Sequence, residues 1–359
     1  MKKQLITLAT ATAMTAPAAV LADAHSDGPE VYGRVHLSLD HEGYDVNAAG
    51  DSGDLTLASR TSRIGVRGSE EVSYGLTAIY QFEHQLDASD SGFSGQQLRD
   101  TFVGVQGDWG QVRAGRLPAL NGIVYGPGNF FPTQAGDPGN VLLAMGAAED
   151  DGSFLGGRAS GVVEYTTALA GPVQASVQFI PSAYEEPGDH EHDYSLWVTY
   201  DEGPLAAQGT VYVYHYDDDP VGSGAEAGDN DTLAALQAEY DFGLFRVGGG
   251  FATVSSDVDD MDDSAAWLGA GFDVTETGTI NVQYSGLMAD RDDADASIIA
   301  LGFTEALSDR TSAYANVAFI DNDEKNAVNP HSYASTGPQD GIANDEDGQV
   351  VSVGVIHDF

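Results

Sequence analysis

The chain has 359 residues, no cysteine, and 56 acidic against 14 basic side chains, so its formal net charge is −42. This charge excludes a general nucleic-acid-binding protein, which needs a basic surface. The absence of cysteine excludes disulfides, zinc–thiolate sites and a thiol nucleophile, and a hydrophobic content of 42% excludes an acidic disordered tail. We therefore expect a folded protein with an unusually acidic exterior.

The first 24 residues have the pattern of a secretory signal peptide. Lysines at positions 2 and 3 form a positive start, Leu5 to Val20 is apolar and rich in threonine, and Ala22-Asp23-Ala24 is a small-x-small cleavage pattern. A membrane anchor is the alternative, but the stretch is short for a membrane helix and rich in alanine and threonine rather than leucine. We expect cleavage after Ala24, or after Ala22, and a mature domain that covers residues 25–359.

The rest of the chain has the pattern of a succession of β-strands. Residues 173–179, 279–285 and 351–355 alternate polar and apolar side chains, and this period of two indicates a strand with one apolar and one polar face. Sixteen such segments are predicted, near residues 30–40, 60–70, 76–86, 98–107, 111–118, 158–167, 172–181, 193–201, 204–215, 231–242, 244–254, 264–273, 278–288, 295–304, 310–320 and 349–359.

The connections between these segments alternate between two lengths. Short turns with glycine or proline, such as 73–75 and 170–172, alternate with long acidic segments such as 182–192, 217–230 and 321–348. Membrane barrels have short turns on one side and long loops on the other, and strands of about ten residues match a tilted crossing. A soluble β-sandwich also alternates, but it seldom has sixteen strands in one domain. We predict an all-β fold, a transmembrane antiparallel β-barrel with about 16 strands and both termini at the short-turn side.

Several segments carry a resemblance to a known family. They are Glu-Val-Tyr-Gly-Arg-Val at 30–35, the run from Ser59 to Glu71, Gly75–Glu83, Arg99–Val105 and Gly110–Arg116. These segments resemble the first strands of Gram-negative general porins, the trimeric sixteen-stranded family. The resemblance implies a water-filled outer-membrane channel that lets small hydrophilic solutes and ions diffuse passively, with no catalytic residue and no cofactor.

The end of the chain resembles the outer-membrane insertion signal of the same family. The signal comprises the terminal Phe359 and the alternate residues Val351, Val353 and Val355 before it. His357 is a departure, because an aromatic or apolar residue is more usual there.

The arginines predict one wall of a pore constriction. An arginine that faces lipid at mid-bilayer costs about 2–4 kcal/mol, so residues opposite the apolar face of the first strands should point into the lumen. In the porins that the chain resembles, residues matching Arg34, Arg63, Arg99 and Arg158 form a basic wall. The predicted basic wall is therefore Arg34, Arg63, Arg67, Arg99 and Arg158. For Arg60, Arg113 and Arg116, a scaffold role in interior salt bridges stays open.

The segment 119–157 resembles the third loop of these porins, which folds into the barrel and narrows it. Related porins often carry acids on this loop, whereas Asn129 and Thr133 are neutral, so we expect Asp137 or the acidic cluster that follows to supply the opposing charge. The predicted loop residues at the constriction are Asn129, Thr133, Asp137, Glu149, Asp150 and Asp151.

The basic wall and the acidic excess have opposite expected effects on ion selectivity. The arginine wall favours anions, whereas the acidic excess concentrates cations at the channel mouth. We expect weak cation selectivity. The acidic runs Asp217–Asp219 and Asp257–Asp263 could bind adventitious calcium or bridge to lipopolysaccharide through divalent ions. Neither run has the pattern of an EF-hand loop.

Other functions remain open as alternatives. A substrate-specific channel, for example for sugars, fits the same fold. An outer-membrane enzyme would use histidines near loop edges, His84, His190, His192 or His215, but no G-x-S-x-G or H-E-x-x-H motif is present. A secreted β-protein such as a lectin is a further alternative. The partners that the resemblance implies are two further copies of the chain in a homotrimer, outer-membrane lipid, lipopolysaccharide and small solutes.

Overall fold

The structure is a computed structural model that describes residues 28–44, 55–89, 98–119, 126–146, 158–181, 192–216, 229–329, 345 and 347–359. The predicted signal peptide lies outside these residues. This part of the chain contains no helix that is long and apolar enough to cross a membrane.

The described chain is almost entirely β-structure. Its strands are β1 (Glu30–Tyr44), β2 (Leu55–Ser59), β3 (Arg63–Val72), β4 (Leu76–Gln85), β5 (Thr101–Gly107), β6 (Gly110–Pro118), β7 (Arg158–Thr167), β8 (Val173–Ile180), β9 (Asp193–Glu202), β10 (Leu205–His215), β11 (Asn230–Asp241), β12 (Phe245–Ser256), β13 (Ser264–Asp273), β14 (Gly278–Met288), β15 (Ala296–Ser308), β16 (Thr311–Asn322) and β17 (Gly348–Asp358). Two short helices accompany them, the 3-10 helix η1 (Ser73–Gly75) and α1 (Gly139–Leu142).

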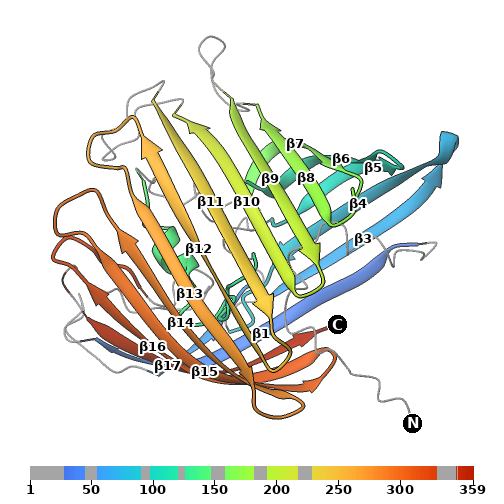
Figure 1. The fold of residues 1–359 in the computed structure, drawn as a ribbon. Helices are drawn as coiled ribbons and strands as arrows, with labels where there is room; N and C mark the ends of the chain where they lie inside the picture. The colour runs from blue at the N-terminus through green and yellow to red at the C-terminus, as the bar shows by residue number, and fades with distance from the viewer. Residues whose placement is uncertain are drawn as a thin grey trace.

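The strands form one closed antiparallel barrel (Figure 1). Each strand from β3 to β16 pairs with the next in the chain, and β17 pairs with β1, with Arg34 opposite Asp358 and Tyr44 opposite Gly348. β2 and β3 both pair with β1, at 37–41 and 30–34 respectively. They are therefore two parts of one interrupted strand, and the wall has sixteen positions, as predicted.

The interruption between β2 and β3 differs from the continuous strand predicted near 60–70. Thr61 has a φ of 50°, a left-handed conformation that a β-branched residue rarely adopts. The hydroxyl of Ser62 accepts a hydrogen bond from the His36 amide and donates one to the His36 carbonyl. These hydrogen bonds to β1 take the place of the regular backbone hydrogen bonds between paired strands. Next to the break, the side chain of Arg60 points into the barrel and forms an ion pair with Asp40.

The alternation of apolar and polar side chains along each strand gives the barrel an outer and an inner face of different composition. On β14, Tyr284 is 52% exposed whereas its neighbour Gln283 is 1% exposed. The outer face of the barrel is thus apolar and available to lipid, and the inner face carries small and polar residues.

The segment 126–146 lies against the inner face of the barrel, where Figure 1 shows α1. The Phe130 amide donates to the side-chain oxygen of Gln283 at 2.8 Å, and Asn316 donates to the side-chain oxygen of Gln134 at 3.1 Å. The Gly146 amide donates to the Asp263 carboxylate at 2.8 Å. The predicted in-folded loop therefore contacts the wall from β13 to β16.

Candidate functional site: a row of ion pairs on the inner wall

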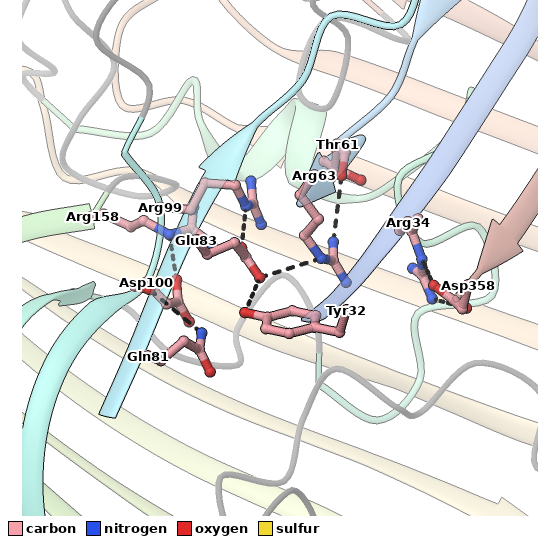
Figure 2. Close-up of polar contacts among 10 residues, drawn as sticks. All are labelled: Tyr32, Arg34, Thr61, Arg63, Gln81, Glu83, Arg99, Asp100, Arg158 and Asp358. Atoms are coloured by element: carbon pink, nitrogen blue, oxygen red, sulfur yellow. Dashed lines mark hydrogen bonds and ion pairs between the residues drawn. The ribbon is translucent and has the colours of Figure 1, made fainter. Parts of the chain in front are cut away.

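A row of arginines and carboxylates crosses the inner wall of the barrel (Figure 2). We call it the charge row, and it comprises Arg34 on β1, Arg63 on β3, Glu83 on β4, Arg99 and Asp100 just before β5, Arg158 on β7 and Asp358 on β17. The strand register brings them together, because Arg34 lies opposite both Arg63 and Asp358.

The two ends of the charge row are tight ion pairs. Arg34 binds Asp358 in a two-point contact, with Nε to Oδ1 at 2.6 Å and Nη2 to Oδ2 at 2.8 Å. Arg158 donates from Nε to Oδ1 of Asp100 at 2.5 Å. Such charge-assisted bonds are short and strong, so they fix both guanidinium groups on the wall.

The centre of the charge row is the carboxylate of Glu83. Its Oε1 accepts a hydrogen bond from Arg99 Nε at 2.6 Å. Its Oε2 accepts one from the Tyr32 hydroxyl at 2.9 Å and lies 3.5 Å from Arg63 Nε. Arg63 also donates from Nη1 to the Thr61 carbonyl at 3.4 Å.

The arginine side chains of the charge row are mostly buried in the inner wall of the barrel. Their side chains are only 7–15% exposed. The row contains four guanidinium groups and three carboxylates, which alternate in sign along most of its length. Most of the positive charge is therefore neutralised locally.

The structure places four of the five predicted wall arginines in this row. The fifth, Arg67, is more exposed, pairs with Glu30 at 3.0 Å and lies over the Tyr32 ring, with 4.8 Å between its guanidinium carbon and the ring centroid. The sequence analysis did not identify the carboxylates of the row. Glu83 shares its strand parity with Thr77 and Gln81, opposite to Tyr80 and Phe82 on the outer face, and this pattern could have indicated that it faces inward.

The remaining early arginines have other roles. Arg60 and Asp40 form an ion pair with both side chains 0% exposed, and Arg113 pairs with buried Glu164. Both are scaffold pairs. Arg116 donates to the Leu98 carbonyl and to the Ser160 hydroxyl.

Asp137, the one acidic side chain within 126–146, is bound by the loop itself. Asp137 is 1% exposed, and its carboxylate accepts hydrogen bonds from the amides of Thr133 and Gly139, at 2.6 and 2.9 Å, and from the Asn129 side chain at 3.1 Å. Burial raises the pKa of Asp137 to about 7 in spite of these bonds. The described hydrogen bonds of Asp137 are therefore bonds within its own loop, and its role as an acid opposite the arginine wall remains a prediction.

The partly exposed surface of the described loop segment, 126–146, carries no charged side chain. Within 126–146 the partly exposed side chains are those of Pro127, Asn129, Pro132, Leu143 and Ala144. Thr133 is buried and its hydroxyl lies 3.4 Å from Nδ1 of His36. Glu149, Asp150 and Asp151 lie outside the described residues, so their predicted role remains a prediction.

The chain end closes the barrel. The backbone of Phe359 exchanges two hydrogen bonds of 3.0 Å with that of Gly33, and its ring lies where a Cβ on Gly33 would clash. Val351, Val353 and Val355 are exposed on the outer face. Their use as an insertion signal remains a prediction.

The described histidines and acidic runs do not gather into a metal site. No group of three metal-ligating side chains occurs in the described ranges. His192 packs against Phe179, and His215 lies 3.8 Å from Asp193. Within Asp257–Asp263, the Asp263 carboxylate accepts hydrogen bonds from the Gly146 and Asp290 amides, and His190 and Asp217–Asp219 lie outside the described residues.

Comparisons with known proteins agree with this geometry. A family model described as Gram-negative porin matches residues 7–325. The chain is 29% identical to Outer membrane porin protein 32 of Delftia acidovorans, with the whole of both chains covered, and 28% identical to Major outer membrane protein P.IB of Neisseria gonorrhoeae over 58% of this chain and 56% of the other.

Solved structures show the same fold. The anion-selective porin from Comamonas acidovorans superposes with a TM-score of 0.76 and 26% identity, over 92% of this chain and 99% of the other. OmpT of Vibrio cholerae superposes with a TM-score of 0.65 and 17% identity, over 92% and 97%, and shows the fold alone.

Proposed function

Because the chain belongs to the Gram-negative porin family, we propose that it is a water-filled channel through which small hydrophilic solutes and ions diffuse passively, with weak selectivity for cations. The family and the relatives place the protein in the outer membrane, as a channel and not an enzyme. Passive diffusion requires no cofactor.

The local pairing of the arginines supports cation selectivity. Each guanidinium of the charge row has a carboxylate within 3.5 Å, and the partly exposed surface of the described loop residues, 126–146, is neutral. The paired row therefore contributes a small field to the lumen. The net charge of −42 then decides which ions pass more readily, since it concentrates cations at the channel mouth.

A specific observation favours anion selectivity as the second candidate. The charge row has one more arginine than carboxylate, and the structural neighbour from Comamonas acidovorans is described as anion-selective. If this surplus arginine outweighs the distant acids, anions pass more readily.

The proposed assembly is a homotrimer in outer-membrane lipid. Membership of the porin family supports self-association, and the apolar outer face of the barrel suits contact with lipid. Lipopolysaccharide is the proposed neighbour at the long-loop side.

A zero-current potential across a tenfold KCl gradient tests the selectivity, and swelling of liposomes in isotonic sugars tests diffusion. We expect swelling that slows with sugar size and a potential with the sign of K⁺ preference. A potential of the opposite sign would establish the anion-selective alternative. Liposomes that do not swell would contradict the diffusion channel.

A further inference from the structure

One row of residues crosses the inner wall from β11 to β16 at a single level of the barrel. We call it the loop seat, and each member pairs with the next in the strand register: Glu239, Gly248, Gly269, Gln283, Ala300 and Ala318. Four of these residues are glycine or alanine. Another segment of the chain can therefore approach the strand backbone at this level.

The loop segment 126–146 enters the loop seat at its β11 end. The Gly128 amide donates to Oε2 of Glu239 at 3.3 Å. A Cβ on Gly248 would lie 2.8 Å from the Cα of Gly128, so loop and strand are in backbone contact there. The ring of Phe130, which is 5% exposed, takes the place that a Cβ on Gly269 would occupy.

The loop then follows the loop seat toward β16. Gln283 binds it at two points, because its side-chain oxygen accepts the Phe130 amide at 2.8 Å and its side-chain nitrogen donates to the Gly136 carbonyl at 3.2 Å. Gly136 has a φ of 90°, and a Cβ there would overlap the Cβ of Ala300 and lie 3.7 Å from that of Ala318. The loop is thus in contact with the wall along the whole row.

The loop seat and the charge row lie on different parts of the wall. The loop seat uses β11–β16, whereas the charge row uses β17, β1, β3, β4, β7 and the residues just before β5. We propose that the loop seat, and Gly269 in particular, determines the size limit of the pore, because each missing side chain lets the loop lie closer to its own wall and farther from the charge row. This proposal rests on the proposed channel function and deepens it.

The variant Gly269→Ala adds one methyl group beneath the Phe130 ring. The atoms nearest to the new Cβ would be two carbons of that ring, while the Val282 carbonyl oxygen would lie at 3.0 Å. The ring has little room to turn aside, since Gly271 borders it and the guanidinium carbon of Arg246 lies 5.6 Å from its centroid. Carbon atoms pack at about 3.5–4.0 Å, so ring and loop should move about 1 Å into the lumen.

A narrower lumen should slow the passage of large solutes most. We expect liposomes with Gly269→Ala to swell more slowly than wild type in the largest neutral sugars that the wild type admits, with little change for the smallest sugar. Single-channel conductance should fall as well. Neutral sugars are the chosen probe because the charge row does not select among them.

Gly209→Ala is the matched control. It adds the same methyl group in a strand, β10, but on the outer face, where the nearest atom to the new Cβ is Leu236 Cδ1 at 3.9 Å. Its swelling rates should equal those of the wild type. Phe130→Ala removes the obstacle itself, so adding Gly269→Ala to that variant should cause no further narrowing.

Ala300→Val is a second variant that keeps the proposal testable if Gly269→Ala yields no folded, heat-modifiable barrel. Valine suits a strand, and its extra methyl groups lie against Gly136 in the same row. It should therefore slow the passage of large sugars as Gly269→Ala does.

Swelling rates and a crystal structure of Gly269→Ala decide the matter. A Phe130 ring displaced by about 1 Å, together with slower swelling in large sugars, supports the proposal. A ring at its wild-type position overturns it, and so do swelling rates equal to those of Gly209→Ala or equal narrowing with and without the Phe130 ring. A wild-type protein that admits no sugar would contradict the channel function separately, because the displacement of the ring does not depend on permeation.

Discussion

Replacing Glu83 by glutamine removes the carboxylate that Arg63 and Arg99 share. The change keeps the side-chain shape and leaves the charge row with four arginines and two carboxylates. One unit charge acts on an ion about 4 Å away in water with about 1 kcal/mol, which corresponds to roughly fivefold in partitioning. Removal of the charge disfavours K⁺ and favours Cl⁻ by about that factor each, so we expect Glu83→Gln to lower the ratio of K⁺ to Cl⁻ permeability by about 25-fold at low salt.

The zero-current potential of the purified variant in a planar bilayer measures this change. Glu202→Gln is the control, because it removes the same charge at the exposed end of β9 and should leave the potential near that of the wild type. Raising the KCl concentration should shrink the difference between the two variants, since a Debye length of about 3 Å at 1 M screens even nearby charges.

The prediction has a clear refutation. The loss of Glu83 leaves Arg99 with 7% exposure and without its carboxylate, so folding of the variant must be verified by its heat-modifiable migration in gels. A folded Glu83→Gln channel with the wild-type potential would show that the charge row does not control ion passage. A shift toward K⁺ would refute the electrostatic reasoning altogether.

Three further changes test the scaffold around the row. Asp40→Asn leaves Arg60 without its carboxylate partner in a pair with 0% exposure, which should cost about 3–5 kcal/mol and lower the temperature at which the heat-modifiable band is lost. Asp137→Asn removes a carboxyl with a raised pKa of about 7. The ionised form is the costly one, so the wild-type loop should lose stability and gain open-channel noise as pH rises from about 4 to 7, whereas the variant stays flat. Gly33→Val places a side chain where the Phe359 ring lies and should reduce the yield of closed barrel in the outer membrane.

Each of these changes has an outcome that contradicts its reasoning. An Asp40→Asn barrel with unchanged thermal stability would show that the buried pair contributes little. Equal pH dependence of noise in the wild type and in Asp137→Asn would show that Asp137 does not hold the loop. Gly28→Val is the control for Gly33→Val, because nothing lies within 4 Å of a Cβ added at Gly28. Equal yields of the two variants would show that the close contact between Gly33 and Phe359 is not needed to close the barrel.

Periodicity alone predicted most of the strands, because a barrel wall keeps one face apolar over its whole height. The bounds of β13 and β14 agree with the prediction to the residue. The break between β2 and β3 was not predictable, since it depends on the left-handed Thr61 and on hydrogen bonds that Ser62 makes with His36, 26 residues away.

The same contrast holds at the site. Strand parity indicated that Arg34 and Arg63 face inward, because the alternative is an arginine in lipid. Their neutralisation was not predictable, since Arg34 finds its partner Asp358 at a separation of 324 residues, where only the closure of the barrel brings β17 to β1. The hydrogen bonds of Asp137 to the amides of Thr133 and Gly139 were not predictable for a related reason, because local sequence does not show whether a loop carboxylate faces water or its own backbone.

Single-channel recording of the purified wild-type protein in a planar bilayer tests the proposed channel most directly. We predict discrete conductance steps that increase with KCl concentration and close in groups of three. A bilayer that stays silent, although the added protein is folded and heat-modifiable, would contradict an open diffusion pore.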